Sequence, residues 1–338
     1  MRSSHDTDRA LESGKLPHEL LAELLGEMAP PPPEVRLGAG IGEDASAIDV
    51  PGGTLVVAAD PITLTAEDAA RLSVVVNAND VAVCGARPRW FLAVVLLPPG
   101  TRESTVRALF RELQLVAQEV GVAVVGGHTE ITPAVNRPVV VGQMLGLSER
   151  GAILTTKGFA PGDVVVQVRA APIEGGAVLA REARDRLGAL EEDVIVKALE
   201  ALERPGIVLV EAALLAAELG AKALHDPTEG GLSGGLFEMA AAAGVRIRIA
   251  EDSVLWFEPA VLVCRELGCD PWSTLASGTL LAAFPAEVAE AAVFTLSARG
   301  HEAAVIGSVE AGAGVCHSDG SPFVWPERDE VARLFAAH

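Results

Sequence analysis

The feature that most constrains how this chain folds is a set of five short polar strings, each bordering a strongly apolar segment. In chain order they are GIGEDASAIDV (40–50), AADPIT (58–63), NANDVAVCGARP (77–88), GGHTEIT (126–132) and HDPTEGGL (225–232). Four of them place an aspartate among Gly, Thr or Asn residues. An aspartate beside buried chain costs free energy unless a cation or a hydrogen-bond donor meets it. The strings therefore favour a fold that brings several carboxylates to one shared site.

The length and composition predict a globular protein of two domains. The chain has 338 residues, of which 50% are hydrophobic and 21% charged, and this balance shows no sign of global disorder. We expect an N-terminal helix and proline-rich link over 1–34, a first domain over 35–149 and a second domain over 150–338. Strands and helices alternate with long crossovers in both domains, so the predicted fold class is α+β or α/β.

The hydrophobic pattern predicts the elements of each domain. Helices are expected over 16–28, 66–84, 102–120, 174–187, 191–202, 207–219, 232–243, 258–267, 286–298 and 327–337. Strands are expected over 55–60, 90–97, 122–127 and 138–147, after Pro161-Gly162, and over 245–250, 278–284 and 302–309. A loop is expected to follow Gly127, and another is expected over 311–322. The apolar strands of the first domain need to be buried against another surface, which predicts a dimer.

The charge excludes several classes of partner. Lys plus Arg number 26 against 46 Asp plus Glu, a net charge of −20. Such a surface repels nucleic acid and anionic membranes, so we expect neither as a partner. The first residues lack the apolar core of a signal peptide, and no run of about 18 apolar residues occurs. We expect a cytoplasmic protein whose four cysteines are reduced and structural.

Three aspartates are the candidate metal ligands: Asp44, Asp60 and Asp80. Magnesium takes oxygen ligands, usually one or two carboxylates, and completes its shell with phosphate and water. Each aspartate also has a simpler explanation. Asp44 could sit in a surface turn, Asp60 could cap a helix, and Asp80 could bond, with Asn77 and Asn79, to other helices.

The glycine-rich strings supply candidate contacts to a nucleotide. Gly42 permits a bend and a close approach of the backbone. In GGHTEIT, the backbone N–H groups of Gly126 and Gly127 could meet a phosphate, and His128 and Thr129 could add side-chain contacts. Asp226 and Thr228 precede a predicted helix, whose N-terminus favours anions, although Thr228 could equally be an ordinary N-cap. The chain has no GxxxxGK[ST] loop.

Taken together, the five strings resemble those of the superfamily named for aminoimidazole ribonucleotide synthetase. Its relatives include selenophosphate synthetase, thiamine-monophosphate kinase and the hydrogenase-maturation carbamoyl dehydratase. The resemblance covers residues 36–310 or so, and also takes in the AAAGVRIRI and GTLLAAF segments. The strings NANDVAVCGARP and HDPTEGGL look most similar to those of the hydrogenase-maturation member.

This resemblance implies a fold, a ligand and a chemistry. An N-terminal domain would dimerise by forming a β-barrel with its partner's sheet, and ATP with Mg²⁺ would lie in the cleft between it and a C-terminal α/β domain. Asp44, Asp60 and Asp80 would hold magnesium, Gly126 to Thr129 would line the nucleotide site, and Asp226 would complete the phosphate region. The implied reaction is an ATP-driven activation of an acceptor by phosphoryl transfer.

One difference from the hydrogenase-maturation member leaves the identity of the acceptor undetermined. The hydrogenase-maturation member carries its acceptor on a cysteine at the extreme C-terminus, whereas this sequence ends VARLFAAH and its last cysteine is Cys316. The acceptor could be a small molecule or be borne by a protein, and no residue is assigned a catalytic role. The alternative is a nucleotide-binding regulatory or assembly dimer without turnover.

Overall fold

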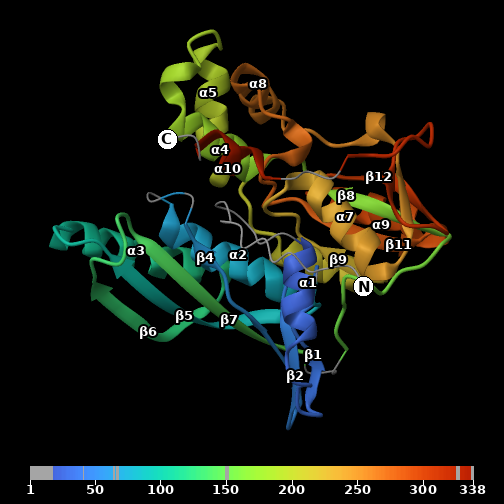
Figure 1. Cartoon of the computed structure of the whole chain (residues 1–338), viewed down its shortest axis with the longest axis horizontal. Helices are drawn as coiled ribbons and strands as arrows, with labels where there is room; N and C mark the ends of the chain where they lie inside the picture. Colours follow the sequence, from blue (N-terminus) through green and yellow to red (C-terminus); the bar gives the residue numbers. More distant parts are fainter. Residues whose placement is uncertain are drawn as a thin grey trace, which may run out of the picture.

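The structure is a computed structural model that describes residues 18–40, 42–63, 65, 68–148, 152–324 and 328–335. It contains two sheet-bearing domains, which Figure 1 shows side by side. Helices and strands alternate, and most strand pairs are antiparallel, so the fold class is α+β. None of the helices in the described parts of the chain combines the length and apolarity needed to cross a membrane.

The first domain is a seven-stranded sheet with the order β1-β2-β3-β7-β5-β6, in which β4 also pairs with β7. Its elements are α1 (His18–Gly26), β1 (Val35–Leu37), β2 (Ser46–Val50), β3 (Gly53–Ala58), β4 (Pro61–Ile62), α2 (Ala69–Val83), β5 (Arg87–Leu97), α3 (Glu103–Val120), β6 (Ala123–Ile131) and β7 (Val139–Ser148). Among the described strands of this sheet, β5 and β6 are parallel neighbours and the other pairs are antiparallel. Helices α2 and α3 lie on one face of this sheet (Figure 1).

Helix α2 approaches β7 closely because two glycines in the strand make room for it. A Cβ atom on Gly142 would lie 2.4 Å from Nδ2 of Asn77 and 2.6 Å from the Ser73 carbonyl oxygen. A Cβ atom on Gly146 would lie 2.4 Å from a methyl group of Val81. The glycines thus set the depth at which the polar residues of α2 meet the sheet.

The opposite face of the first sheet is apolar but only partly covered. Buried and half-buried residues alternate along β5 and β7, as expected for strands packed on one face. The half-buried positions of that face include Leu92, Val94, Val141 and Leu145. A sheet face of this composition favours burial against another surface.

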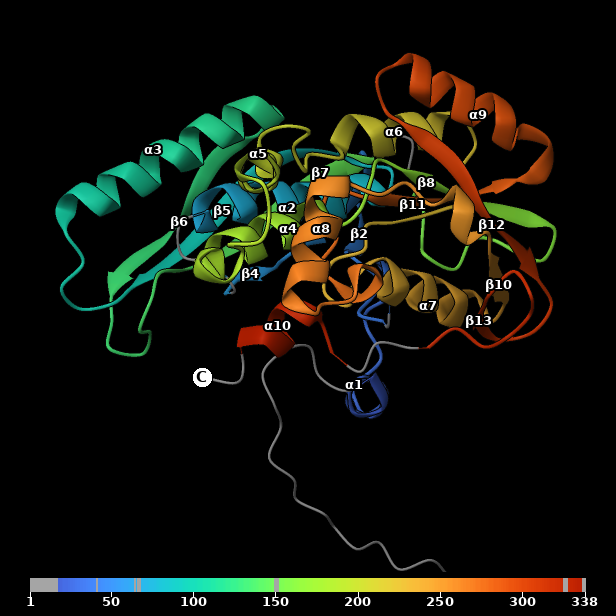
Figure 2. The same cartoon turned by 90° about the horizontal axis from the view of Figure 1, so that it is seen from above.

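The second domain is a six-stranded sheet with the order β13-β10-β12-β8-β11-β9. Its strands and helices are β8 (Asp163–Val168), α4 (Ile173–Glu182), α5 (Glu192–Leu199), α6 (Val210–Glu218), β9 (Ala223–His225), α7 (Gly231–Ala243), β10 (Arg246–Ile249), α8 (Glu258–Leu267), β11 (Leu280–Pro285), α9 (Ala286–Ala298), β12 (Ala303–Glu310), β13 (Gly314–Cys316) and α10 (Glu330–Phe335). Figure 2 shows α6 and α9 on one side of its strands and α7 on the other. Helices α4, α5, α8 and α10 form a separate apolar cluster.

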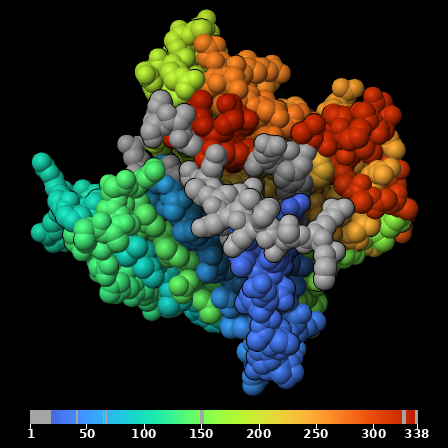
Figure 3. All heavy atoms as spheres, in the orientation of Figure 1, coloured from blue at the N-terminus to red at the C-terminus, as the bar shows by residue number. Residues whose placement is uncertain are grey.

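Helix α2 also joins the two domains. The side chain of Asn79 donates to the carbonyl of Ile207 at 2.9 Å and accepts from the backbone N–H of Leu209 at 2.8 Å. All three residues are buried, and one apolar cluster runs from α2 to α6 and on to α9. The first and second domains therefore share part of their core. Figures 1 and 3 show the two domains next to each other.

The observed elements agree with most of the expected ones. Helices α8 and α9 begin and end where the pattern predicts, and α1 is shorter than predicted, with residues 16 and 17 outside the described residues. The main correction concerns GGHTEIT, because β6 continues to Ile131 where a loop was expected after Gly127. The short strands β1, β2, β4, β9 and β13 were not expected, and β13 lies within the segment 311–322 that was expected to be a loop. All four cysteines are free and buried.

We predict that Gly142→Ala destabilises the protein by about 1–3 kcal/mol, since the new methyl group forces α2 away from β7. The matched control is Gly126→Ala, where a Cβ atom would meet only Leu92 at 3.7 Å. Denaturant unfolding of both variants measures the difference. Equal stability of the two variants would contradict this account of the helix–sheet contact.

Candidate functional site

Four aspartates from distant parts of the chain converge where α2 meets the second domain. Asp44 lies just before β2, Asp60 lies between β3 and β4, Asp80 belongs to α2, and Asp226 follows β9. Their charges act on one another, because Asp226, Asp60 and Asp44 all raise the pKa of the Asp80 carboxyl. The structure thus brings the three predicted metal ligands together with Asp226.

Burial makes this arrangement costly. Asp80 is 4% exposed and Asp226 is 1% exposed. No other described residue donates a hydrogen bond to Oδ2 of Asp80 or to either carboxylate oxygen of Asp226, although the backbone of Asp226 slightly lowers the pKa of its own carboxyl group. Burial is the main reason why the pKa values of both carboxyl groups are well above the ordinary range. A bound cation would stabilise buried carboxylate oxygens that lack hydrogen-bond donors.

One buried histidine offsets part of this negative charge. The ring of His225 contacts Oδ2 of Asp44 through Nδ1 at 2.8 Å and Oε2 of Glu238 through Nε2 at 2.9 Å. Burial lowers the pKa of His225, but the two carboxylates outweigh burial and hold the pKa well above its ordinary value. The imidazolium therefore donates to both partners and fixes Asp44 in place.

The two asparagines of α2 position the site without belonging to it. Oδ1 of Asn77 accepts from the backbone N–H of Asp60 at 2.9 Å, and its Nδ2 donates to the Ser73 carbonyl at 2.8 Å. Asn79 holds the loop before α6, as described above. For these two residues the simpler explanation, hydrogen bonding to other parts of the fold, is the one the structure shows.

The carboxylate oxygens of this site suit magnesium, although they do not complete its coordination shell by themselves. Carboxylate oxygens are the ligands that Mg²⁺ prefers, and the orphaned oxygens of Asp80 and Asp226 are the ones lacking partners. Across the described ranges, no three His, Cys, Asp or Glu side chains converge closely enough to hold a metal ion by themselves. Water and phosphate oxygens would therefore have to complete the coordination shell, as is usual for magnesium.

The HDPTEGGL turn leads directly from Asp226 into α7. Gly230 is the N-cap of this helix, with a φ of 89°, so Thr228 is not the cap that its sequence position allowed. Thr228 is half-buried, and its carbonyl accepts from the N–H groups of Gly231 and Ala276. The N–H of Gly230 donates at 2.8 Å to the carboxylate of Asp329, which comes from the segment before α10.

The GGHTEIT string lies apart from the four aspartates within one chain. The backbone carbonyl of Asp60 accepts from the N–H of Gly142 on β7. Gly142 pairs with Ala93 on β5, and Ala93 pairs with Gly127 on the edge strand β6. Three strand spacings of about 4.8 Å separate Asp60 from β6, roughly 14 Å in all. His128 is exposed and contacts Glu130 at 3.1 Å. Gly126 and Thr129 are also exposed.

Gly127 has a structural reason to be glycine. Its φ is 146°, and a Cβ atom there would lie 1.9 Å from the carbonyl oxygen of Ala93. This clash makes glycine necessary for pairing β6 with β5, whatever else binds to the strand. Gly42 has a φ of 71°, and its carbonyl accepts a short hydrogen bond from the Thr156 hydroxyl.

Sequence reasoning missed three site residues: His225, Glu238 and Glu43. His225 stands directly before Asp226 inside one of the strings, so its position was a usable signal. Glu238 belongs to α7 and had no signal in the sequence. The side chain of Glu43 is 6% exposed and lies 3.5 Å from Nζ of Lys157, in the segment that connects the two domains.

Family models identify the class of protein. Residues 42–148 match the N-terminal domain of AIR synthase related proteins, and residues 160–317 match the C-terminal domain. The chain therefore belongs to the AIR synthase-related family, as the strings predicted.

Relatives within the family place the chain near the hydrogenase-maturation members. It is 31% identical to the carbamoyl dehydratase HypE of Azotobacter vinelandii over 79% of each chain. It resembles the crystal structure of the hydrogenase maturation protein HypE in complex with ATP, with a TM-score of 0.69 and 25% identity over 86% of this chain and 90% of that one. The fold is also that of AaThiL complexed with AMPPCP and TMP, with a TM-score of 0.71 and 19% identity over 92% and 94% of the two chains.

A further buried acid lies beside the HDPTEGGL turn. Glu174, at the start of α4, is 6% exposed. Burial raises the pKa of its carboxyl from the ordinary 4.5 to about 7, partly offset by a hydrogen bond with Ser277, and the charges of Asp329 and Glu229 raise it further. Between these two pH values the folded protein binds more protons than the unfolded chain, so stability falls as the pH rises.

We predict that Glu174→Gln reduces the loss of stability between pH 4.5 and 7 and makes the protein more stable than the wild type above pH 7. The amide cannot ionise, so it avoids the cost of a buried charge. Glu182→Gln, at the exposed end of the same helix, should keep the wild-type pH dependence. Thermal unfolding across this pH range measures both, and an unchanged slope in Glu174→Gln would contradict the prediction.

Proposed function

We propose that this protein is a magnesium–ATP-dependent enzyme that activates an acceptor by phosphoryl transfer. The observation that carries the proposal is the set of buried carboxylate oxygens without hydrogen bonds on Asp80 and Asp226, converging with Asp44 and Asp60. The HypE relative that binds ATP supports the nucleotide. A carboxylate-rich site on a chain with net charge −20 favours metal-bound phosphate over free phosphate.

In this proposal each side chain has a defined role. Asp44, Asp60 and Asp80 hold magnesium, and Asp226 contributes its oxygens, unpartnered among the described residues, to the same metal site at the α7 turn, on the side of the phosphates. Bound magnesium would supply the positive charge that neutralises the transferring phosphoryl group. His225 holds Asp44 in its orientation through a buried hydrogen bond. Asn77 does the same for the backbone at Asp60.

The remaining predicted nucleotide contacts divide into two groups. Gly42 and Thr228 lie in the two loops that carry Asp44 and Asp226, so both are placed to approach the phosphates. Gly126, Gly127, His128 and Thr129 lie on the edge strand β6, away from these loops. We propose that they act in a homodimer, in which an edge strand and an apolar sheet face are covered by a second copy.

Aspartate 80 gives the sharpest test. We predict that Asp80→Asn weakens Mg-ATP binding at least tenfold, because it removes a charged ligand from the metal. In the absence of magnesium the same variant should be more stable than the wild type at pH 8, because folding no longer has to bury or protonate a carboxylate whose pKa the fold raises. Calorimetric titration and thermal unfolding measure the two effects. Asp193→Asn, an exposed change on α5, is the control.

A variant that binds Mg-ATP more weakly but is more stable without the metal has lost a metal ligand. Unchanged Mg-ATP affinity in Asp80→Asn would remove this residue from the site. Release of ADP in the presence of candidate acceptors then separates the enzyme from its alternative. Tight ATP binding with no release under any condition would leave a nucleotide-binding regulatory or assembly protein.

We predict a dimer at micromolar concentration that depends on the open face of the first sheet. Val94→Asp places a charge at the centre of that face and should produce monomers. Leu115→Asp changes an exposed apolar residue on α3 and should leave the dimer intact. Light scattering after gel filtration measures the mass. A monomeric wild type, or equal behaviour of the two variants, would contradict this interface.

A further inference from the structure

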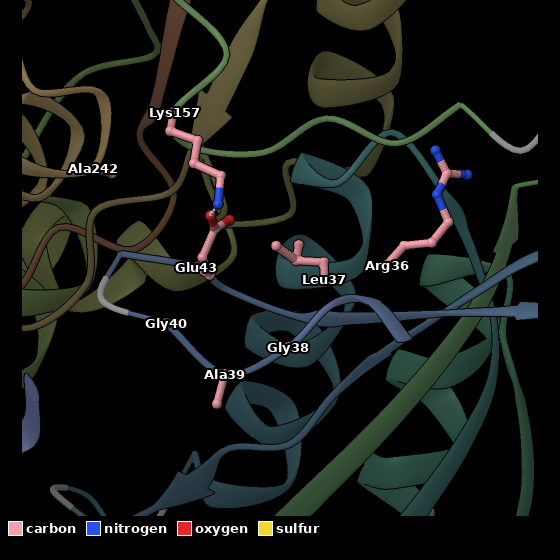
Figure 4. Close-up of a pocket in the computed structure, with 8 residues that line it drawn as sticks. All are labelled: Arg36, Leu37, Gly38, Ala39, Gly40, Glu43, Lys157 and Ala242. Carbon is pink, nitrogen blue, oxygen red and sulfur yellow. Dashed lines mark ion pairs between the residues drawn. The ribbon is translucent and has the colours of Figure 1, made fainter. Parts of the chain in front are cut away.

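A cavity lies beside the loop that carries Asp44. Its volume is about 290 Å³, and it is lined by Arg36, the 38–40 loop, Glu43, Lys157 and Ala242. Figure 4 shows Lys157 reaching the carboxylate of Glu43 at one end and Arg36 extending at the other. The first domain, the connecting segment and the end of α7 all contribute to its wall.

The cavity and the carboxylate site share one stretch of backbone. Glu43 lines the cavity, and its neighbour Asp44 bonds to His225. Thr156 fixes this stretch, because its hydroxyl donates to the carbonyl of Gly42 and its N–H contacts Glu43 at 3.4 Å. A ligand in the cavity would therefore lie within one residue of the proposed metal site.

Lys157 is the side chain of the cavity that favours an anionic ligand. Lysine is scarce in this chain, and the guanidinium of Arg36, which also lines the cavity, donates to the hydroxyl of Thr54 at 3.1 Å and lies 3.6 Å from the carboxylate of Asp49. The side chain of Lys157 is 57% exposed, and its contact with Glu43 is 3.5 Å long. The comparable pair of Lys222 and Asp163 is 2.7 Å long. An ammonium group has three donors, so the looser pair leaves capacity for a second acceptor in the cavity.

We propose that this cavity binds the acceptor of the reaction and that the acceptor carries a phosphate or carboxylate group paired with Lys157. The inference rests on the proposed function, since it assigns the second substrate of the same site. A volume of about 290 Å³ is at the lower end of the range for small-molecule sites, which favours a small metabolite over a protein segment. The reactive end of such a molecule would face the loop that carries Asp44.

Calorimetric titration of the full chain with inorganic phosphate, and separately with acetate, tests the proposal. EDTA keeps the metal site empty, so that its carboxylates repel anions. We expect saturable binding of at least one probe, and at least a tenfold loss of affinity in Lys157→Met, which keeps the apolar stem but loses the charge. Lys157→Arg should retain most of the affinity. Lys222→Met, which breaks the matched pair outside the cavity, should not change it.

The outcomes separate this inference from the proposed function. Binding of neither probe, or equal affinities in Lys157→Met and the wild type, would overturn it even if Mg-ATP binds and depends on Asp80. Equal losses in the Lys157→Met and Lys222→Met variants would also overturn it. A parallel titration with Mg-ATP completes the test. An equal loss of Mg-ATP affinity in Lys157→Met would make the cavity part of the nucleotide site and overturn its assignment to the acceptor.

Discussion

The carboxylate site depends on the groups that offset the mutual repulsion of four clustered aspartates, of which Asp80 and Asp226 are buried and Asp44 and Asp60 are half-buried. Asp44 has a charged partner, since the ring of His225 bonds Asp44 through one nitrogen and Glu238 through the other. Asp80 and Asp226 retain oxygens without hydrogen bonds among the described residues. Keeping such oxygens buried costs free energy, which magnesium and a nucleotide would recover on binding. In this account the aspartates are the protein's part of a site that magnesium and a nucleotide complete.

Helix α2 links the carboxylate site to both domains. One surface packs on β7 through the space left by Gly142 and Gly146, and Asn79 on the helix bonds the loop before α6. Asp80 lies between these contacts, so its carboxylate is held where both domains meet. The polar residues of an otherwise apolar helix thus have two different roles, because the asparagines fix the geometry and the aspartate meets the ligand.

The sequence predicted the fold class, most helices and the convergence of the aspartates, because hydrophobic periodicity and Gly–Asp turns are local signals. It failed where the cause was not local. The GGHTEIT string looked like a loop because of its glycines, yet Gly127 is needed for strand pairing with Ala93. Glu238 belongs to an ordinary helix pattern, and only the fold brings it to His225. The short strands β9 and β13 exist because longer neighbours pair with them.

The most direct measurement of the central claim is a crystal structure of the protein soaked with Mn²⁺ and a non-hydrolysable ATP analogue. Manganese replaces magnesium at oxygen-rich sites and is located by its anomalous scattering. We predict anomalous peaks bonded to Asp44, Asp60 or Asp80, with the phosphates of the analogue completing the shell. Peaks elsewhere, or an analogue bound away from these carboxylates, would contradict the account.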